Sequence, residues 1–232
     1  MKKLTKRLKT IGSLSDKTKS YNLKDAIAIL MKAPKLKFDE TVELSANLSI
    51  DPKQSQSASI RGTVALPHGT GKKVRVAVFC KGEEERKAKA AGADFVGAED
   101  LIAKVQGGWV DFDVAIATPD MMKDMAKLGK VLGPRGLMPN PKSGTVTMET
   151  AKTIKEVKAG KIEFKMDKQA GVHAPLGKMS FTEDALYANA VSLIDAIMSS
   201  NPSGLKGHHV KNLYISTTMG PGIKLDITEF RK

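Results

Sequence analysis

The chain has 232 residues, and 38 lysines and arginines stand against 25 aspartates and glutamates, a formal net charge of +13. At about 150 residues per domain, this length predicts one large domain or two small ones. The single cysteine excludes an internal disulfide and a cysteine-rich zinc site. No apolar run approaches the roughly 18 residues of a membrane span, so we expect a cytoplasmic protein with no membrane partner.

The positive charge favours a polyanionic partner over a small neutral substrate. It is concentrated at the start of the chain, where residues 1–37 hold 11 lysines or arginines against two acidic residues. Such an arm either follows the phosphates of a nucleic acid or is a solvated tail that aids solubility. The charge alone does not decide between the two.

The first elements along the chain indicate a helix and two strands. Apolar Leu23, Ile27, Leu30 and Met31 at helical spacing predict a helix that begins after Asn22, its N-cap, and ends before Pro34. Strict alternation over residues 42–50, ended by Asp51-Pro52, and again over 60–66 predicts two strands. We expect these strands to share one sheet with one face free.

The middle of the chain has a different pattern. Short apolar segments at 74–80, 94–96 and 114–117 alternate with helical segments at 83–91, 99–106 and 121–132. Alternating strands and helices predict a parallel three-layer α/β unit, which is Rossmann-like. A glycine- and proline-rich loop at 133–144 and a helix at 150–158 follow it.

The two-residue period returns after residue 160, so the two ends of the chain resemble each other more than either resembles the middle. Strands are predicted over 161–167, from Val172 onward and over 213–217, with a helix at 182–199. We therefore expect an α/β protein of two domains. A discontinuous α+β domain with a half-open sheet takes residues 1–68 and 160–232, and an inserted α/β domain takes 69–159.

The two crossings between these domains contain glycine. They lie at His68-Gly69 and at Ala159-Gly160. Glycine permits hinge motion there, and it equally suits a tight packed turn.

Motifs for catalysis are weak. The glycines of residues 69–73 precede a strand, whereas a phosphate-binding loop lies between a strand and a helix. No dinucleotide fingerprint follows Cys80, and that cysteine suits a buried position better than a nucleophile. The four histidines lack the spacing of a helical zinc site. We therefore expect a protein that is not an enzyme and that has no metal site and no cofactor. The alternative is a nucleotide-dependent enzyme that uses the inserted domain.

Two segments carry features of an RNA-binding site. Phe38 lies among charged residues, where it can rest on a ribose or base while Lys37 meets a phosphate, or else fold under as a core anchor. Residues 216–222 combine hydroxyls, a methionine and glycines after a strand. Such a turn can bind phosphate or 2′-hydroxyl groups, or be a simple β-turn.

Four longer runs carry a family resemblance. They are KFDETVEL (37–44), RGTVALPHG (61–69), LGPRGLMPNPK (132–142) and TTMGP (217–221). Together and in this order they resemble the family of large-subunit ribosomal protein number one, the protein of the mobile stalk beside the tRNA exit site, in its bacterial form. The resemblance covers almost the whole chain.

The resemblance implies a non-enzymatic, monomeric component of the ribosome with a split RNA-binding domain. Its first RNA partner would be the stalk of large-subunit ribosomal RNA. It would also assist the movement and release of exit-site tRNA. In addition, it would bind the leader of its own mRNA and repress translation of that mRNA. By matching motif, the principal RNA-binding residues would be Lys37, Phe38, Thr41, Thr217, Thr218, Met219 and Gly220, and the peripheral ones Lys165, Asp167, Lys168 and His173. Asn212 stands where many members have serine. A non-specific RNA chaperone is a further alternative.

Overall fold

The computed structural model describes residues 6–16, 18–49, 60–200 and 209–230; Ile50, Asp51-Pro52 and His208 lie outside them. The chain divides into two compact units, Met1–Gly71 with Ile162–Lys232, and Lys72–Lys161. The chain thus leaves the first unit, builds the second and returns, and it crosses two or three residues beyond the crossings predicted from the sequence.

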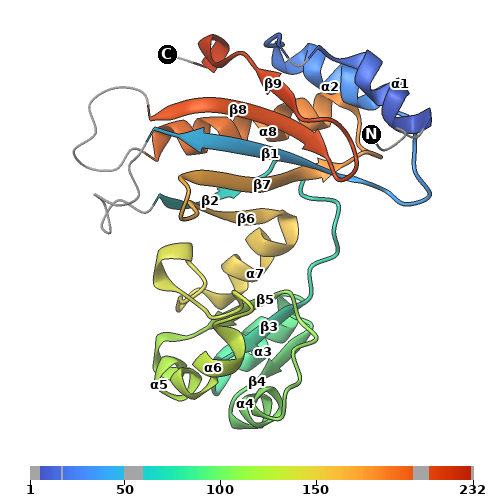
Figure 1. Cartoon of the computed structure of the whole chain (residues 1–232). Helices are drawn as coiled ribbons and strands as arrows, with labels where there is room; N and C mark the ends of the chain where they lie inside the picture. Colours follow the sequence, from blue (N-terminus) through green and yellow to red (C-terminus); the bar gives the residue numbers. More distant parts are fainter. Residues whose placement is uncertain (1–5, 17, 50–59, 201–208, 231–232) are drawn as a thin grey trace. The chain divides into compact units, whose positions relative to one another are not determined.

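Strands from both ends of the chain form the main sheet of the first unit (Figure 1). It is antiparallel in the order β7 (Gly171–Lys178), β1 (Thr41–Leu48), β8 (Val210–Thr217) and β9 (Ile223–Leu225). Even-numbered β1 residues from Val42 to Leu48 are buried, as the alternation predicts. Helices α2 (Leu23–Met31) and α8 (Glu183–Ser199) pack against that face.

Pairing of the strand at 60–66 differs from the expectation. Strand β2 (Arg61–Ala65) does not join β1 but pairs with β6 (Lys161–Lys165) in a separate two-stranded sheet. Both edges of β1 are already taken, by β7 on one side and β8 on the other. Strand β2 instead places Gly62 against the ring of Phe164, where an added Cβ would lie 2.6 Å from Cζ.

The caps of α2 and α8 also differ from each other. Asn22 stands at the N-cap of α2 as predicted, but its side chain makes no capping hydrogen bond. Instead, Glu229 from the 3₁₀ turn η4 (Ile227–Phe230) accepts a hydrogen bond from the Leu23 N–H at 3.2 Å. The Thr182 hydroxyl caps α8. The sequence also missed α1 (Lys6–Leu14) and β9.

The second unit is a three-layer α/β structure, as predicted. Its parallel sheet has the order β4 (Phe95–Gly97), β3 (Val76–Phe79) and β5 (Val114–Ala117). Strand β3 is buried on both faces, with Val76 and Val78 in one apolar cluster and Ala77 and Phe79 in the other. Helices α3 (Glu83–Ala90) and α7 (Thr150–Ala159) supply residues to the first cluster, and α4 (Glu99–Gln106) to the second.

The single helix expected at 121–132 is a chain of short turns. These are η1 (Pro119–Met121), α5 (Met122–Met125), η2 (Ala126–Leu128) and α6 (Gly129–Leu132), and η3 (Pro141–Ser143) follows in the loop. Met121, Met125, Leu128 and Leu132 keep helical spacing and are buried. Gly129 in the interior disfavours a continuous α-helix.

No helix among the described residues is long and apolar enough to cross a bilayer.

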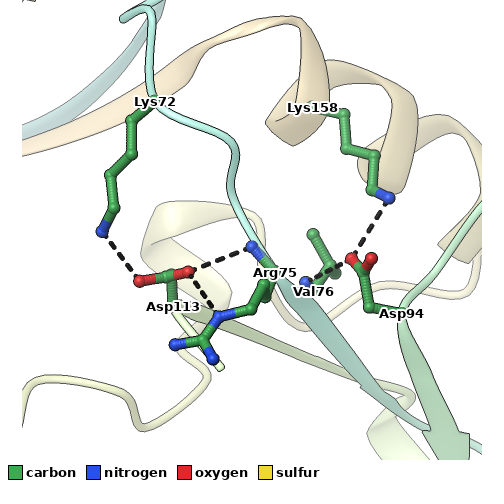
Figure 2. A network of polar contacts seen from close by, with 6 residues as sticks. All are labelled: Lys72, Arg75, Val76, Asp94, Asp113 and Lys158. Atoms are coloured by element: carbon green, nitrogen blue, oxygen red, sulfur yellow. Dashed lines mark hydrogen bonds and ion pairs between the residues drawn. The ribbon is translucent and has the colours of Figure 1, made fainter. Parts of the chain in front are cut away.

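Two carboxylates hold the start of β3 (Figure 2). Asp113 accepts hydrogen bonds from Lys72 Nζ at 2.7 Å and from the Arg75 N–H at 3.1 Å. Asp94 accepts the Val76 N–H at 2.9 Å and pairs with Lys158 at 3.1 Å. Lys72 of the glycine-rich segment 69–73 is therefore engaged with the second unit's own sheet.

These contacts predict an acid-sensitive second unit. The Lys72 hydrogen bond, with those from Arg75, lowers the pKa of Asp113 from 3.8 to about 2. A lowered folded-state pKa stabilises the fold above the ordinary pKa, and this contribution is lost as pH falls from 3.8 towards 2. In urea unfolding, Asp113→Asn should be less stable than wild type at pH 7, and the gap should narrow at pH 3.

The exposed neighbour Asp111 offers a matched control for that measurement. Asp111→Asn should follow the wild-type pH dependence. An Asp113→Asn deficit of equal size at pH 7 and pH 3 would contradict the assignment.

Cys80 is fully buried at the end of β3. Burial, with the nearby charges of Glu85 and Glu84, raises the pKa of its thiol to about 11. A thiol of this pKa is protonated at neutral pH and is a poor nucleophile. The expected packing role of Cys80 agrees with this environment.

Candidate nucleic-acid interface

The two candidate RNA-binding segments lie side by side although about 180 positions separate them. Strand β1 begins at Thr41 and β8 ends at Thr217, and the antiparallel register places Val42 opposite Thr217. The Thr218 N–H donates to the Thr41 carbonyl at 3.0 Å, and the Thr41 N–H donates to the Thr218 hydroxyl at 3.0 Å. The sheet therefore joins residues 37–41 and 217–220 into one surface, here called the strand-end surface.

Exposed apolar side chains distinguish this surface. Phe38 is 53% exposed and Met219 is 56% exposed, two of only four large hydrophobic side chains in the described residues that are exposed. Lys37 and Thr218 beside them are exposed too. Phe38 is therefore not a core anchor, and it is available for contact with a ribose or base.

Thr217 and Gly220 shape the turn from within. Thr217 is only 5% exposed, and its carbonyl accepts the Gly220 N–H at 3.1 Å. A Cβ at position 220 would lie 2.2 Å from Thr217 Oγ1. Glycine is thus required by close approach, and these two residues support the turn that presents Met219.

Residues on the β7 side hold the other segment. Lys178 Nζ donates to the Thr41 hydroxyl at 2.8 Å, and Ser180 donates to Asp39 through its N–H at 3.1 Å and its hydroxyl at 2.7 Å. The Met179 N–H donates to the Glu40 carbonyl at 2.9 Å. These bonds hold residues 39–41, which directly follow Lys37 and Phe38, in place without a ligand.

Two residues at this surface escaped the sequence analysis, Glu40 and Arg7. Glu40 is 5% exposed, and its Oε2 accepts the Met219 N–H at 3.0 Å. Arg7, on α1, donates to Glu40 Oε1 at 3.2 Å and to the Met219 carbonyl at 3.0 Å. The alternation of β1 could have revealed Glu40, because the buried positions are even-numbered, as at Val42 and Leu44, and position 40 continues that series. No pattern in the basic arm singles out Arg7.

Helix α1 gives part of the basic arm a fixed place. It carries Lys6 and Lys9, which are exposed, next to the strand-end surface that Arg7 contacts. A groove of about 530 Å³ lies between this helix and the β8–β9 hairpin, with Ile11, Tyr214 and Met219 among its walls. The described part of the arm is therefore not a free tail.

The four peripheral candidates lie elsewhere. His173 pairs with Ser45 across the sheet, and Ser45 Oγ lies 3.0 Å from His173 Nδ1. Asp167 accepts the Gln169 and Gly171 N–H groups, both at 2.7 Å, and these bonds lower the pKa of Asp167. Lys165 and Lys168 are exposed nearby. The turn at 167–171 leads into β7, where Gly171 lies opposite Asn47 of β1. Asn47 is six residues from Thr41, so at about 3.3 Å per residue this turn lies about 20 Å from Thr41 along the strand.

The candidate hinge residues form fixed turns in this structure. The buried Asn189 side chain accepts the His68 N–H at 3.0 Å and donates to the Gly69 carbonyl at 2.9 Å. Gly160 ends α7 in a left-handed conformation with φ +108°, and Ala159 is the last residue of that helix. Hinge motion at these positions stays a prediction.

Asn212, on β8, lies opposite Asn47 of β1, away from the turn at 217–220.

Metal chemistry has no support in the residues at hand. Within 6–16, 18–49, 60–200 and 209–230, no group of three or more histidine, cysteine or acidic side chains is placed to hold an ion. His173 Nε2 and Asp167 Oδ2 lie 3.9 Å apart as a pair. The strand-end surface itself presents hydroxyl, cationic and apolar side chains.

Comparisons with known proteins identify the family. The model of the ribosomal protein L1p/L10e family matches residues 30–221. A relative from Protochlamydia amoebophila (strain UWE25), large ribosomal subunit protein uL1, is 51% identical over 225 residues, which cover 97% of this chain and 95% of the relative. The chain therefore belongs to the ribosomal protein L1p/L10e family, a family of structural, rRNA-binding proteins of the large ribosomal subunit and not of enzymes.

Proposed function

We propose that the chain binds the stalk of large-subunit ribosomal RNA through the strand-end surface. The observation that carries this proposal is the juxtaposition of exposed Phe38 and Met219 with Lys37 and the Thr218 hydroxyl on one rigid strand end. All seven principal candidates belong to the first unit, which both ends of the chain build. That unit is the RNA-binding domain in this proposal.

Each group has a distinct task on RNA. Lys37 meets a phosphate, Phe38 stacks on a ribose or base, and Met219 fills the adjacent apolar space. The hydroxyls of Thr41 and Thr218 meet 2′-hydroxyl groups, which distinguish RNA from DNA. Because each hydroxyl is already fixed by one protein partner, it is presented in a defined direction. The surface reads the shape of a folded RNA.

The proposal extends to two further RNAs. As a monomer bound to the ribosome in the cytoplasm, the protein assists the movement and release of exit-site tRNA. A leader structure in its own mRNA that mimics the stalk would occupy the same surface. Ribosomal RNA and the leader are then mutually exclusive, and free protein represses its own translation only when stalk RNA is saturated.

A gel-shift salt titration on stalk RNA tests the proposal. If six to ten phosphates are contacted, affinity should fall by about 10³ to 10⁵ between 50 and 200 mM salt. Unlabelled stalk RNA and leader RNA should compete, whereas an unrelated folded RNA should not. An affinity that does not change with salt would contradict the proposal, and equal competition by every RNA would favour the non-specific chaperone.

A further inference from the structure

Helix α1 is connected to the RNA-binding turn through one cluster of charged groups. The Arg7 guanidinium donates from Nη1 to the Met219 carbonyl at 3.0 Å and from Nη2 to Glu40 Oε1 at 3.2 Å. The second Glu40 oxygen accepts the Met219 N–H at 3.0 Å. Both backbone polar groups of Met219 are thus held by this pair.

The cluster is mostly shielded from water. The Glu40 side chain is 6% exposed and that of Arg7 is 23% exposed. The Arg7 Nε–H is buried without a hydrogen-bond partner among the described residues. A buried charged pair contributes little net stability and is costly when one partner is lost. Stability of the fold is therefore a weak reason for placing this pair here.

The direction of the donors argues against a direct phosphate contact by Arg7. Both Nη atoms donate to the protein and Nε is buried, so the bonds already formed orient the guanidinium towards the Met219 turn. Glu40 by itself would place a negative charge under a surface that binds a polyanion. Arg7 neutralises that charge and orients the turn in the same contact.

We propose that Arg7 and Glu40 are positioning residues that preform the Met219 turn for RNA, so that α1 belongs functionally to the RNA-binding site. This inference rests on the proposed function. The backbone of Met219 is held from α1 before RNA arrives, and the ordering cost on binding is reduced. Residues 30–221, which the family model matches, do not include Arg7.

Four variants of the full chain test the inference on stalk RNA. Arg7→Ala should weaken binding about tenfold or more, since it leaves Glu40 unpaired and buried. Glu40→Gln should weaken it less. The double variant Arg7→Ala, Glu40→Gln should recover part of the Arg7→Ala loss, because the uncompensated charge is gone. Arg61→Ala, which breaks the Arg61–Glu163 pair of β2 and β6, is the matched control and should bind as wild type.

The salt dependence separates positioning from phosphate contact. A lysine or arginine on a phosphate contributes about one unit to the slope of log affinity against log salt. A positioning residue leaves that slope unchanged. Arg7→Ala should therefore give a parallel line displaced to weaker binding, with a melting temperature that shows a folded protein. Should Arg7→Ala not fold, Arg7→Lys keeps a charge beside Glu40 but loses the two-pronged contact, and it should show a smaller displacement in the same direction with the slope unchanged.

Distinct results overturn the inference and the proposed function. If wild type binds stalk RNA and folded Arg7→Ala binds equally well, the positioning role is wrong and the proposed function stands. If the slope falls by one unit and the double variant shows no recovery, Arg7 is a phosphate contact instead. If wild type shows no preference for stalk RNA, the proposed function itself fails.

Discussion

Met219→Glu is expected to weaken binding of stalk RNA at least about a hundredfold, because like charges brought together at an interface cost several kcal/mol. Met219, in the strand-end surface, is 56% exposed. The substitution replaces an apolar contact by a carboxylate that faces phosphates and lies close to Glu40. Since the side chain is exposed, the melting temperature should change little. Gel shift on stalk RNA measures the affinity.

Met148 offers a matched control for this experiment. It is 60% exposed in the second unit, so Met148→Glu makes the same chemical change in another part of the chain. It should bind stalk RNA within about twofold of wild type, since it changes the net charge of the protein but not the strand-end surface. Equal losses in the two variants would mean that total charge, and not the strand-end surface, determines affinity.

Gly220→Ala is expected to impair both the turn and RNA binding. The added Cβ would lie 2.2 Å from Thr217 Oγ1 and 3.3 Å from Thr217 Cβ, and Thr217 is buried. Either the turn shifts or Thr217 changes rotamer, and both displace Met219. Overpacking of this kind costs about 1–3 kcal/mol of unfolding free energy. Thermal unfolding should show a lower melting temperature, and affinity for stalk RNA should fall about tenfold or more.

A second glycine of the same turn provides the comparison. A Cβ at Gly222 would meet nothing within 4 Å. Gly222→Ala should therefore keep the wild-type melting temperature, or rise slightly through the loss of chain entropy in the unfolded state. A Gly220→Ala protein as stable and as active in binding as Gly222→Ala would show that the close approach to Thr217 is not required.

Local patterns in the sequence predicted most elements but not their partners. The alternation from Val42 to Leu48 predicted a half-buried strand, and the short apolar segment at 74–80 predicted a strand, which the structure buries on both faces. Which strands pair depends on contacts between distant residues, so β2 was wrongly assigned to the sheet of β1. Strand β9 has only three residues, too short for a periodic signal.

The candidate site shows the same division between local and distant information. The odd position of Phe38 among charges, and the polar, glycine-containing turn after β8, marked both halves of the surface. The register of β1 against β8 brings the halves together, and only the fold provides that register. Arg7 has ordinary neighbours in a basic segment, and its contact with Met219 spans 212 positions. No local pattern reports such a contact.

In the proposed function, one surface of the first unit binds one region of ribosomal RNA. Chemical footprinting of total ribosomal RNA with wild type, Met219→Glu and Met148→Glu tests this binding. We expect one protected region, in the stalk of the large-subunit RNA, with protection retained in Met148→Glu and lost in Met219→Glu. Protection scattered over many regions, or a stalk footprint that Met219→Glu leaves intact, would overturn the proposed function.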